Sequence, residues 1–375
     1  MSDSGNWFAR ARRRCNNSVM RAASGRWEGM NMKAIVYTNY GSPDVLKCVE
    51  IEKPSPGDNE VLIKVRAASI NPLDCGELKG VPYIFRVVFG LRKPDATRPD
   101  RSGVDVAGQV EAVGRNVTLF KAGDEVFGVC IDNPQASGTG VWVHRQGAFA
   151  EYVCAPESTL VLKPDGVTFE QAASVPVAAL TALQGLRDKG RIQAGQRVLI
   201  HGAGGGVGTF AVQIAKSFGA DVTGVSRTSN VDIVRSIGAD RVIDYTQEDF
   251  TTGGQRYDLI LDCFANHPLS RCRRVLSPKG IYVGVGGPGG IGVLVRLIQV
   301  LVLSRFVSQN LVTFLARPRQ ADLALLRDLM AAGKVTPVID RCYPLSDVAE
   351  AFRYFEGRHA RGKVVITVGD NNASL

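Results

Sequence analysis

The residues with the clearest chemistry in this sequence are a cluster of glycines. Residues 202–208 read GAGGGVG and follow the apolar run VLI, with His201 between the two. Such glycines form a tight turn, whose backbone N–H groups can approach a pyrophosphate at the start of a helix. A glycine loop that only caps a helix is the alternative. The flanking apolar runs favour a dinucleotide-binding turn of the form A-x-G-x-x-G, built from Ala203, Gly205, Gly206, Val207 and Gly208.

The residues about 20 positions further on indicate which dinucleotide binds. An Asp or Glu at the end of the second strand accepts the ribose 2′-hydroxyl of NADH and repels a 2′-phosphate. This sequence has Ser226 and Arg227 there. A hydroxyl and a planar guanidinium suit a phosphate, so the pair predicts NADPH. The alternative is that both are solvent-facing loop residues.

The elements that must position these residues follow from the apolar pattern. Between residues 195 and 286 apolar runs alternate with helical patterns, which is typical of a doubly wound parallel sheet. Residues 32–160 are instead rich in short alternating runs that end at turns, as in a β-rich domain. The run KVVITV near residue 365 is expected to pair back into that first domain. Five parallel strands are predicted, at RVLIHG, DVTGVS, RVIDY, YDLILD and GIYVGVG.

The amino-acid composition limits which classes of function are expected. The 375 residues suggest two domains, and 22% charged residues with 41 glycines suit an α/β enzyme. The net charge is +9, of which residues 1–31 carry +4, so that the rest is only mildly basic. Without a basic stripe interleaved with aromatics, nucleic acid is not an expected partner. Eight scattered cysteines without a C-x-x-C favour a reducing compartment, and we expect a cytoplasmic protein.

Several stretches together resemble the medium-chain dehydrogenase/reductase superfamily, in its zinc-free quinone oxidoreductase branch (zeta-crystallin-like). They are residues 71–74 (NPLD), GVDVAGQVEAVG, 121–124 (KAGD), 147–152 (GAFAEY) and the nucleotide segment. The resemblance spans residues 32–369 and departs at Gly204, where the branch usually has Ser, Ala or Cys. It implies a GroES-like catalytic domain at 32–160 and 311–375, a Rossmann NADPH-binding domain at 161–310, and an arm outside the fold, disordered or non-native, at 1–31.

The resemblance also implies that no metal is bound. Zinc enzymes of this superfamily use a Cys, a His-Glu pair and a later Cys or Asp, whereas the first two slots here hold Asn71 and Val104-Asp105. Hydride transfer to a conjugated acceptor needs less help than alcohol oxidation, because the charge spreads over the acceptor. Asn71 is the candidate donor or positioner for that acceptor. Its alternative role is a turn signal before Pro72.

The remaining site residues are implied by the resemblance. Tyr83 is the candidate proton donor, although its spacing differs from that of related reductases, where Cys75 fills the nearer slot; solvent is the alternative. Arg361 and Lys363 compete with Arg358 for the cofactor phosphate, and Tyr245 has core packing as its alternative. The cofactor contacts expected are Thr181, Tyr245, Gly284, Val285, Gly286 and Arg358.

Two apolar segments lie outside this scheme, at 83–91 and 291–303. The second is too short and too interrupted to span a membrane, and its Arg296 and Gln299 share one helical face. By the resemblance, both segments extend loops near the mouth of the cleft, and plant relatives of this branch are membrane-associated. A helix packed on the sheet, a dimer interface, a lipophilic-substrate tunnel and a peripheral membrane contact all remain open.

The leading hypothesis is an NADPH-dependent, zinc-independent reductase of quinones or α,β-unsaturated carbonyls, with a small lipophilic substrate. One alternative is an enoyl-thioester reductase, which needs a long acyl channel and a usable tyrosine. Another is an NADPH-binding structural or partner protein with little turnover, like lens crystallins of this branch. The resemblance suggests a homodimer joined edge to edge near residues 311–315.

Overall fold

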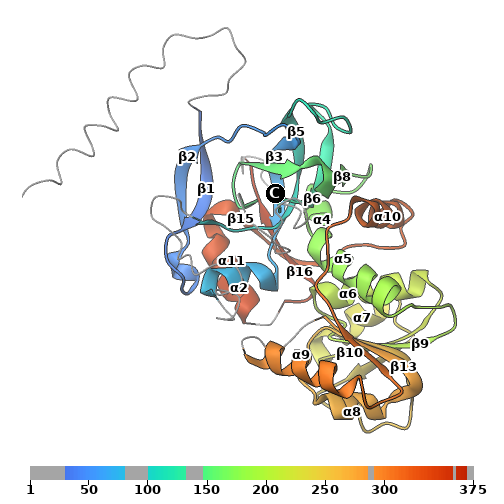
Figure 1. Cartoon of the computed structure of the whole chain (residues 1–375). Helices are drawn as coiled ribbons and strands as arrows, with labels where there is room; N and C mark the ends of the chain where they lie inside the picture. Colours follow the sequence, from blue (N-terminus) through green and yellow to red (C-terminus); the bar gives the residue numbers. More distant parts are fainter. Residues whose placement is uncertain (1–29, 81–99, 132–146, 286–290, 358–359, 370–375) are drawn as a thin grey trace, which may run out of the picture.

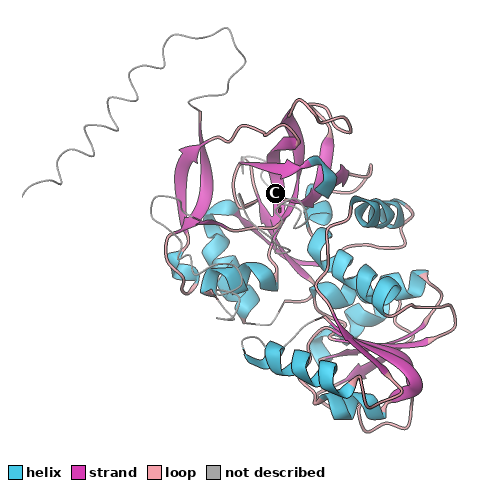
Figure 2. Ribbon diagram, in the orientation of Figure 1, coloured by secondary structure: helices cyan, strands magenta, loops and turns pink. Residues whose placement is uncertain are grey.

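The protein folds as two β-rich regions, here in a computed structural model that describes residues 30–80, 100–131, 147–285, 291–357 and 360–369. Figure 1 shows the first β region above a twisted sheet covered by helices, and Figure 2 shows the strands and helices of each. The helices are α2 (Pro72–Lys79), α4 (Phe169–Ala173), α5 (Pro176–Gln184), α6 (Gly206–Ser217), α7 (Val231–Ser236), α8 (Leu269–Arg274), α9 (Ile291–Leu303), α10 (Gln320–Ala331) and α11 (Val348–Glu356).

The nucleotide domain is a six-stranded parallel sheet in the order β11-β10-β9-β12-β13-β14. This is the Rossmann order, in which a ligand binds outside the carboxyl ends of the strands where the order reverses. All five predicted strands are confirmed, and the sheet gains β14, which carries it past residue 311. Its strands are β9 (Arg197–His201), β10 (Asp221–Ser226), β11 (Arg241–Asp244), β12 (Tyr257–Asp262), β13 (Leu276–Gly284) and β14 (Asn310–Thr313).

The catalytic domain is a largely antiparallel sheet in the order β15-β16-β3-β5-β6-β8, with β7 on β3 and a small sheet of β2-β1-β4 beside it. The predicted return of the chain is confirmed, because β16 pairs with β3 through Val365 and Ser69. Its strands are β1 (Asn31–Tyr37), β2 (Lys47–Glu52), β3 (Glu60–Ser69), β4 (Asp100–Arg101), β5 (Asp105–Val113), β6 (Glu125–Val129), β7 (Tyr152–Pro156), β8 (Leu160–Leu162), β15 (Ile339–Pro344) and β16 (Lys363–Thr367).

The two domains are joined at the glycine turn. The backbone N–H of Gly362, just before β16, donates to the carbonyl of Gly204 at 3.0 Å. Gly362 also forms a parallel bridge with Gly205. The first strand of the nucleotide domain is fully buried at Val198, Leu199 and Ile200, so this turn sits on a rigid base. The strand that starts at Lys363 therefore connects the cofactor turn with the catalytic domain.

Candidate functional site

The glycine turn has the shape that a dinucleotide needs. Gly202 leaves β9 with φ +86°, a conformation that side chains disfavour. A Cβ on Gly208 would lie 2.1 Å from the carbonyl oxygen of Gly202, so only glycine allows α6 to pack this closely. At Gly205, by contrast, the nearest atom would be 3.5 Å away. That open space at the start of α6 is where backbone N–H groups can receive a pyrophosphate.

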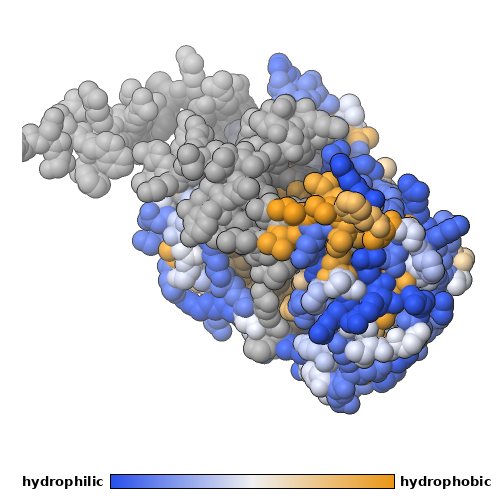
Figure 3. Space-filling view, turned by 60° about the horizontal axis from the view of Figure 1, so that its bottom comes forward, coloured by the Kyte–Doolittle hydropathy of each residue, from blue (hydrophilic) through white to orange (hydrophobic). Residues whose placement is uncertain are grey.

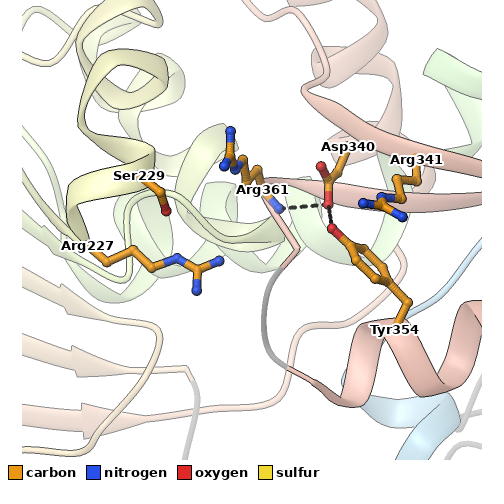
Figure 4. A pocket seen from close by; sticks show the side chains of 6 residues that line it. All are labelled: Arg227, Ser229, Asp340, Arg341, Tyr354 and Arg361. Atoms are coloured by element: carbon orange, nitrogen blue, oxygen red, sulfur yellow. Dashed lines mark hydrogen bonds between the residues drawn. The ribbon is translucent and has the colours of Figure 1, made fainter.

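The second strand brings Ser226 and Arg227 to the same edge. Ser226 ends β10 and is buried, while Arg227 lines a cavity of about 660 Å³. Figure 4 shows Arg227 and Ser229 on one side of this cavity, with Arg361 between them and the residues of the catalytic domain. The lining residues are Arg227, Ser229, Asp340, Arg341, Tyr354 and Arg361. Three guanidinium groups against one carboxylate make the cavity cationic, as a phosphate site must be.

The other predicted cofactor contacts lie at or just after the ends of β11 and β13, or within α5. Tyr245 follows β11, and its N–H donates to the carbonyl of Ser226 at 3.0 Å. Its side chain is 51% exposed, so core packing is not its role. Thr181 is half-buried on α5, where its hydroxyl donates to the carbonyl of Val177. Gly284 ends β13, and the Val285 N–H donates to the Asp262 carbonyl. Three further predictions lie outside the described residues: Tyr83, Gly286 and Arg358.

Asn71 precedes α2 and is almost completely buried. Its backbone N–H donates to Asp74 Oδ2 at 2.7 Å, which fixes the start of the helix. Its side-chain Nδ2 donates to Asp105 Oδ2 at 2.9 Å and, at 3.4 Å, to the carbonyl of Ser69. Its Oδ1 accepts from Lys363 Nζ at 2.6 Å. The amide is therefore oriented by its neighbours and is not simply a turn signal.

Asp105 and Lys363 complete a cluster that the sequence pattern did not predict. We call Ser69, Asn71, Asp105 and Lys363 the Asp105 cluster. Asp105 is fully buried, and its Oδ1 accepts the Val177 N–H at the start of α5 while Oδ2 accepts from Ser69, Asn71 and Lys363. Burial lowers the pKa of Lys363, and the nearby carboxylates of Asp105 and Asp74 oppose that shift. The one available signal was a lysine opening a strand that is otherwise apolar.

A second buried carboxylate lies at the ends of the parallel strands. Asp262, at the end of β12, accepts from the Tyr282 hydroxyl at 2.7 Å and pairs with His201 Nδ1 at 2.8 Å. We call His201, Asp262 and Tyr282 the Asp262 cluster. Burial disfavours ionisation of Asp262, but the hydrogen bond and charge of His201 bring its pKa to about 2. His201 ends β9, as the sequence predicts.

Cys75, in the slot where related reductases carry a tyrosine, is a weaker acid than a free cysteine. It lies on α2, partly buried, and burial raises the pKa of its thiol. A thiol in this environment keeps its proton more firmly than a free cysteine does. Cys75 therefore leaves the source of the proton unassigned.

The helix at 291–303 has an unexpected orientation. Arg296 faces inward and donates to the carbonyls of Ala265 and His267, whereas Gln299 is exposed, so the predicted shared polar face does not form. Apolar side chains point outward instead, with Leu301 64% exposed. Figure 3 shows apolar side chains gathered on this face. The exposed apolar residues here are Val295, Ile298, Leu301, Val302 and Phe306.

The described part of the chain contains neither a cluster suited to a metal ion nor a helix suited to crossing a membrane. Within residues 30–80, 100–131, 147–285, 291–357 and 360–369, no group of three or more His, Cys, Asp or Glu side chains could hold a metal ion. Across the same residues, none of the helices has both the length and the apolar character that crossing a membrane requires.

Comparisons with known proteins agree with this architecture. Residues 57–165 match the alcohol dehydrogenase GroES-like domain, and residues 237–366 match the zinc-binding dehydrogenase family. The chain is 35% identical to the NADPH-dependent alkenal/one oxidoreductase of Arabidopsis thaliana, covering 89% of this chain and 79% of that protein. It is 33% identical to the human quinone oxidoreductase, and the match covers 89% of this chain and 97% of that protein.

Among solved structures, the quinone oxidoreductase from Coxiella burnetii superposes with a TM-score of 0.79 at 30% identity. The match covers 91% of this chain and all of that one. The glycine turn, the Rossmann strand order and these similarities lead to one conclusion. The chain belongs to the quinone oxidoreductase branch of the medium-chain dehydrogenase/reductase superfamily, whose members are nicotinamide-dependent oxidoreductases.

Proposed function

We propose that this protein reduces quinones or α,β-unsaturated carbonyls with NADPH and without a metal ion. The observation that carries the proposal is the contact between the glycine turn and the Asp105 cluster, made through Gly362 and Lys363. The glycine turn that we propose to hold the cofactor thus lies beside a buried polar cluster in the same molecule. When bound, NADPH supplies the hydride, and the residues of this chain bind the cofactor and orient the acceptor.

NADPH rather than NADH is proposed because of the cationic cavity beside β10. Arg227 follows the second strand, where an acidic residue would select NADH. Arg361 comes from the catalytic domain and lines the same cavity. Two guanidinium groups near one another suit the doubly charged 2′-phosphate.

Independence from zinc is supported by the donor set at the superfamily's metal position. Asn71 stands in the first ligand slot and Val104-Asp105 in the second. The Lys363 ammonium lies 2.6 Å from Asn71 Oδ1 and 3.4 Å from Asp105 Oδ2. A metal ion between these groups would meet a positive charge where it needs a lone pair. The three side chains instead satisfy one another.

Asn71 is proposed to orient the acceptor oxygen. One of its Nδ2 hydrogens is held at 2.9 Å by Asp105, whereas the other reaches the Ser69 carbonyl across 3.4 Å. The long bond is the weaker of the two, so this hydrogen is the one that an acceptor carbonyl can take. One such donor stabilises the charge that hydride transfer places on the oxygen. Tyr83 and solvent remain the proposed proton sources.

Two further proposals concern surfaces. A homodimer is proposed to form through β14, which ends the parallel sheet and has β13 on one side. Peripheral membrane contact is proposed through the exposed apolar face of α9 together with 83–91. Size-exclusion chromatography with light scattering tests the dimer. Co-sedimentation with liposomes tests the membrane contact, and Leu301→Glu should reduce it if the contact exists.

The function is tested by following NADPH oxidation with a quinone, an enal and an enoyl-CoA. Turnover of the quinone or the enal supports the proposal, and turnover of the enoyl-CoA alone supports an enoyl-thioester reductase. NADPH binding without turnover supports the partner protein with little activity. In parallel, Arg227→Gln should weaken NADPH binding about tenfold and leave NADH binding unchanged, because only NADPH presents the 2′-phosphate.

A further inference from the structure

Lys363 connects the two halves of the proposed site. Its Cδ would lie 3.1 Å from a Cβ placed on Gly206, so the stem of the side chain rests on the first residue of α6. Its Nζ donates to Asn71 Oδ1 at 2.6 Å, to the carbonyl of Ile70 at 3.3 Å and to Asp105 Oδ2 at 3.4 Å. An ammonium has three hydrogens, and all three are used. The whole residue is 2% exposed.

The bond to Asn71 is the shortest of the three and decides how the amide is turned. An amide that presents Oδ1 to the ammonium must present Nδ2 on its other side, toward Asp105 and the Ser69 carbonyl. Turning the amide over would bring NH₂ against the ammonium and the carbonyl oxygen against the carboxylate. Both contacts would be repulsive in a buried site. Lys363 and Asp105 together therefore fix one orientation of Asn71.

A direct electrostatic role for the ammonium does not fit its surroundings. Two buried carboxylates, Asp105 and Asp74, lie close enough to influence Lys363, so the surroundings offer no surplus of positive charge to an acceptor. The shortest of the three ammonium hydrogen bonds, at 2.6 Å, goes to Asn71. The ammonium is thus committed to its neighbours, and its effect on an acceptor must pass through one of them.

We propose that Lys363 is a positioning residue, which acts through Asn71 by holding the amide with its Nδ2 hydrogen available to the acceptor. The inference rests on the proposed function in taking Asn71 as the group that meets the acceptor. It gives β16 a role in turnover beyond pairing with β3. It also separates two roles in one residue, since the stem contacts the cofactor turn and the ammonium contacts Asn71.

The test uses Lys363→Met, which keeps a stem of similar length against Gly206 and removes the ammonium. Turnover of the acceptor should fall at least about tenfold, because Asn71 is no longer held in one orientation. The dissociation constant for NADPH, measured by fluorescence titration, should change less than about threefold since the stem is retained. The unfolding midpoint in urea is recorded for each variant.

Lys53→Met is the matched control. Lys53 is also a buried lysine of the catalytic domain, 3% exposed, with its ion pair to Glu111 at 2.8 Å. It lies on the loop after β2, pairs with Glu111 and sits over the Tyr152 ring, and neither of these residues belongs to the Asp105 cluster. This variant should lose stability and keep its turnover. Equal losses of turnover in the two variants would overturn the proposal, because a general loss of stability would then explain both.

A double-mutant cycle with Asn71→Ala decides whether Lys363 acts through Asn71. In that background Lys363→Met should cause little further loss of turnover, because the amide to be held is absent. An undiminished loss would overturn the proposal, as would a loss confined to NADPH affinity. Measuring the free energy of unfolding for the same four proteins gives the strength of the contact between Lys363 and Asn71 without relying on activity. If the wild-type protein reduces no acceptor, the proposed function fails, and the unfolding cycle still tests the contact. A coupling of zero between Lys363 and Asn71 in the free energy of unfolding would overturn the inference without touching the proposed function.

Discussion

Two buried carboxylates, Asp105 and Asp262, both accept several hydrogen bonds, but their donors come from different parts of the fold. Both are fully buried at strand ends, and both oxygens of each accept hydrogen bonds. Asp262 takes its partners from the neighbouring strands β9 and β13 and from its own loop at Phe264 and Ala265. The partners of Asp105 come from β3, from Asn71 just before α2, from α5 and from β16, so they span most of the sequence.

The difference shows that a buried carboxylate can stabilise a single domain, as Asp262 does, or can link two domains, as Asp105 does. In a parallel sheet, neighbouring strands end at the same edge, so the Asp262 cluster forms as part of the sheet itself. The Asp105 cluster exists only once β16 has returned to β3 and α5 has docked. Its loss should therefore affect catalysis as well as stability, whereas loss of the Asp262 cluster should weaken mainly the nucleotide domain.

The largest expected effect comes from Asp105→Ala. Removing one partner of a buried pair leaves the other charge uncompensated, which costs about 3–5 kcal/mol. Lys363 would lose its carboxylate partner, and the Val177 N–H would lose its acceptor. We expect that loss in urea unfolding, together with almost no acceptor reduction. A variant that keeps both stability and turnover would show that the cluster does not join the domains.

A smaller effect should appear when Asp262 is titrated. Its pKa of about 2 lies below the ordinary 3.8, so the stabilisation is present above pH 4 and is lost as the pH falls through 2. The shift corresponds to about 2 kcal/mol. Unfolding free energies measured between pH 6 and 2 should show this slope in the wild type. Asp262→Asn should flatten it, and an unchanged slope would assign the acid sensitivity to other carboxylates.

Tyr282→Phe should remove about 1.5 kcal/mol, since it deletes one hydrogen bond to the buried Asp262 carboxylate and keeps the ring. Thermal unfolding measures the loss. Turnover at saturating NADPH should stay near the wild-type value, because no bond of the Asp262 cluster reaches Asn71. A marked fall in turnover would mean that the two clusters are coupled.

The smallest effect is expected from Gly206→Ala. The new methyl would meet Lys363 Cδ at 3.1 Å, so the lysine stem must shift by a few tenths of an ångström. We expect a change in stability below about 1 kcal/mol and a fall in turnover of a few fold. Gly205→Ala is the control, because its methyl reaches no side chain. That control should weaken cofactor binding and leave turnover at saturation intact.

Much of the fold could be predicted from sequence, for a physical reason. The five strands of the nucleotide domain are contiguous apolar runs, and the turn at Gly202–Gly208 needs glycine at particular backbone positions. Each of these signals is local. The placement of Arg227 at the end of β10 follows from them, because a strand end is fixed by the strand that precedes it.

The Asp105 cluster could not be predicted in this way. Asn71 and Lys363 are 292 residues apart, and no local pattern in either segment predicts a contact with the other. The resemblance marked Asn71 and Asp105 as altered ligand positions, yet it placed Lys363 only among the competitors for a phosphate. The helix α9 was misjudged for a related reason. Burial of Arg296 depends on two carbonyls, of Ala265 and His267, which a helical wheel does not contain.

The late position of β16 has a consequence for synthesis on the ribosome. The strands of the nucleotide domain are complete by Thr313, so that domain can close while later residues are still being made. Asp105 by then has been made for some two hundred residues and still lacks its ammonium partner, which follows 258 positions after it. The catalytic domain therefore cannot complete its fold until β16 has been synthesised. Until then the Asp105 carboxylate has no ammonium partner.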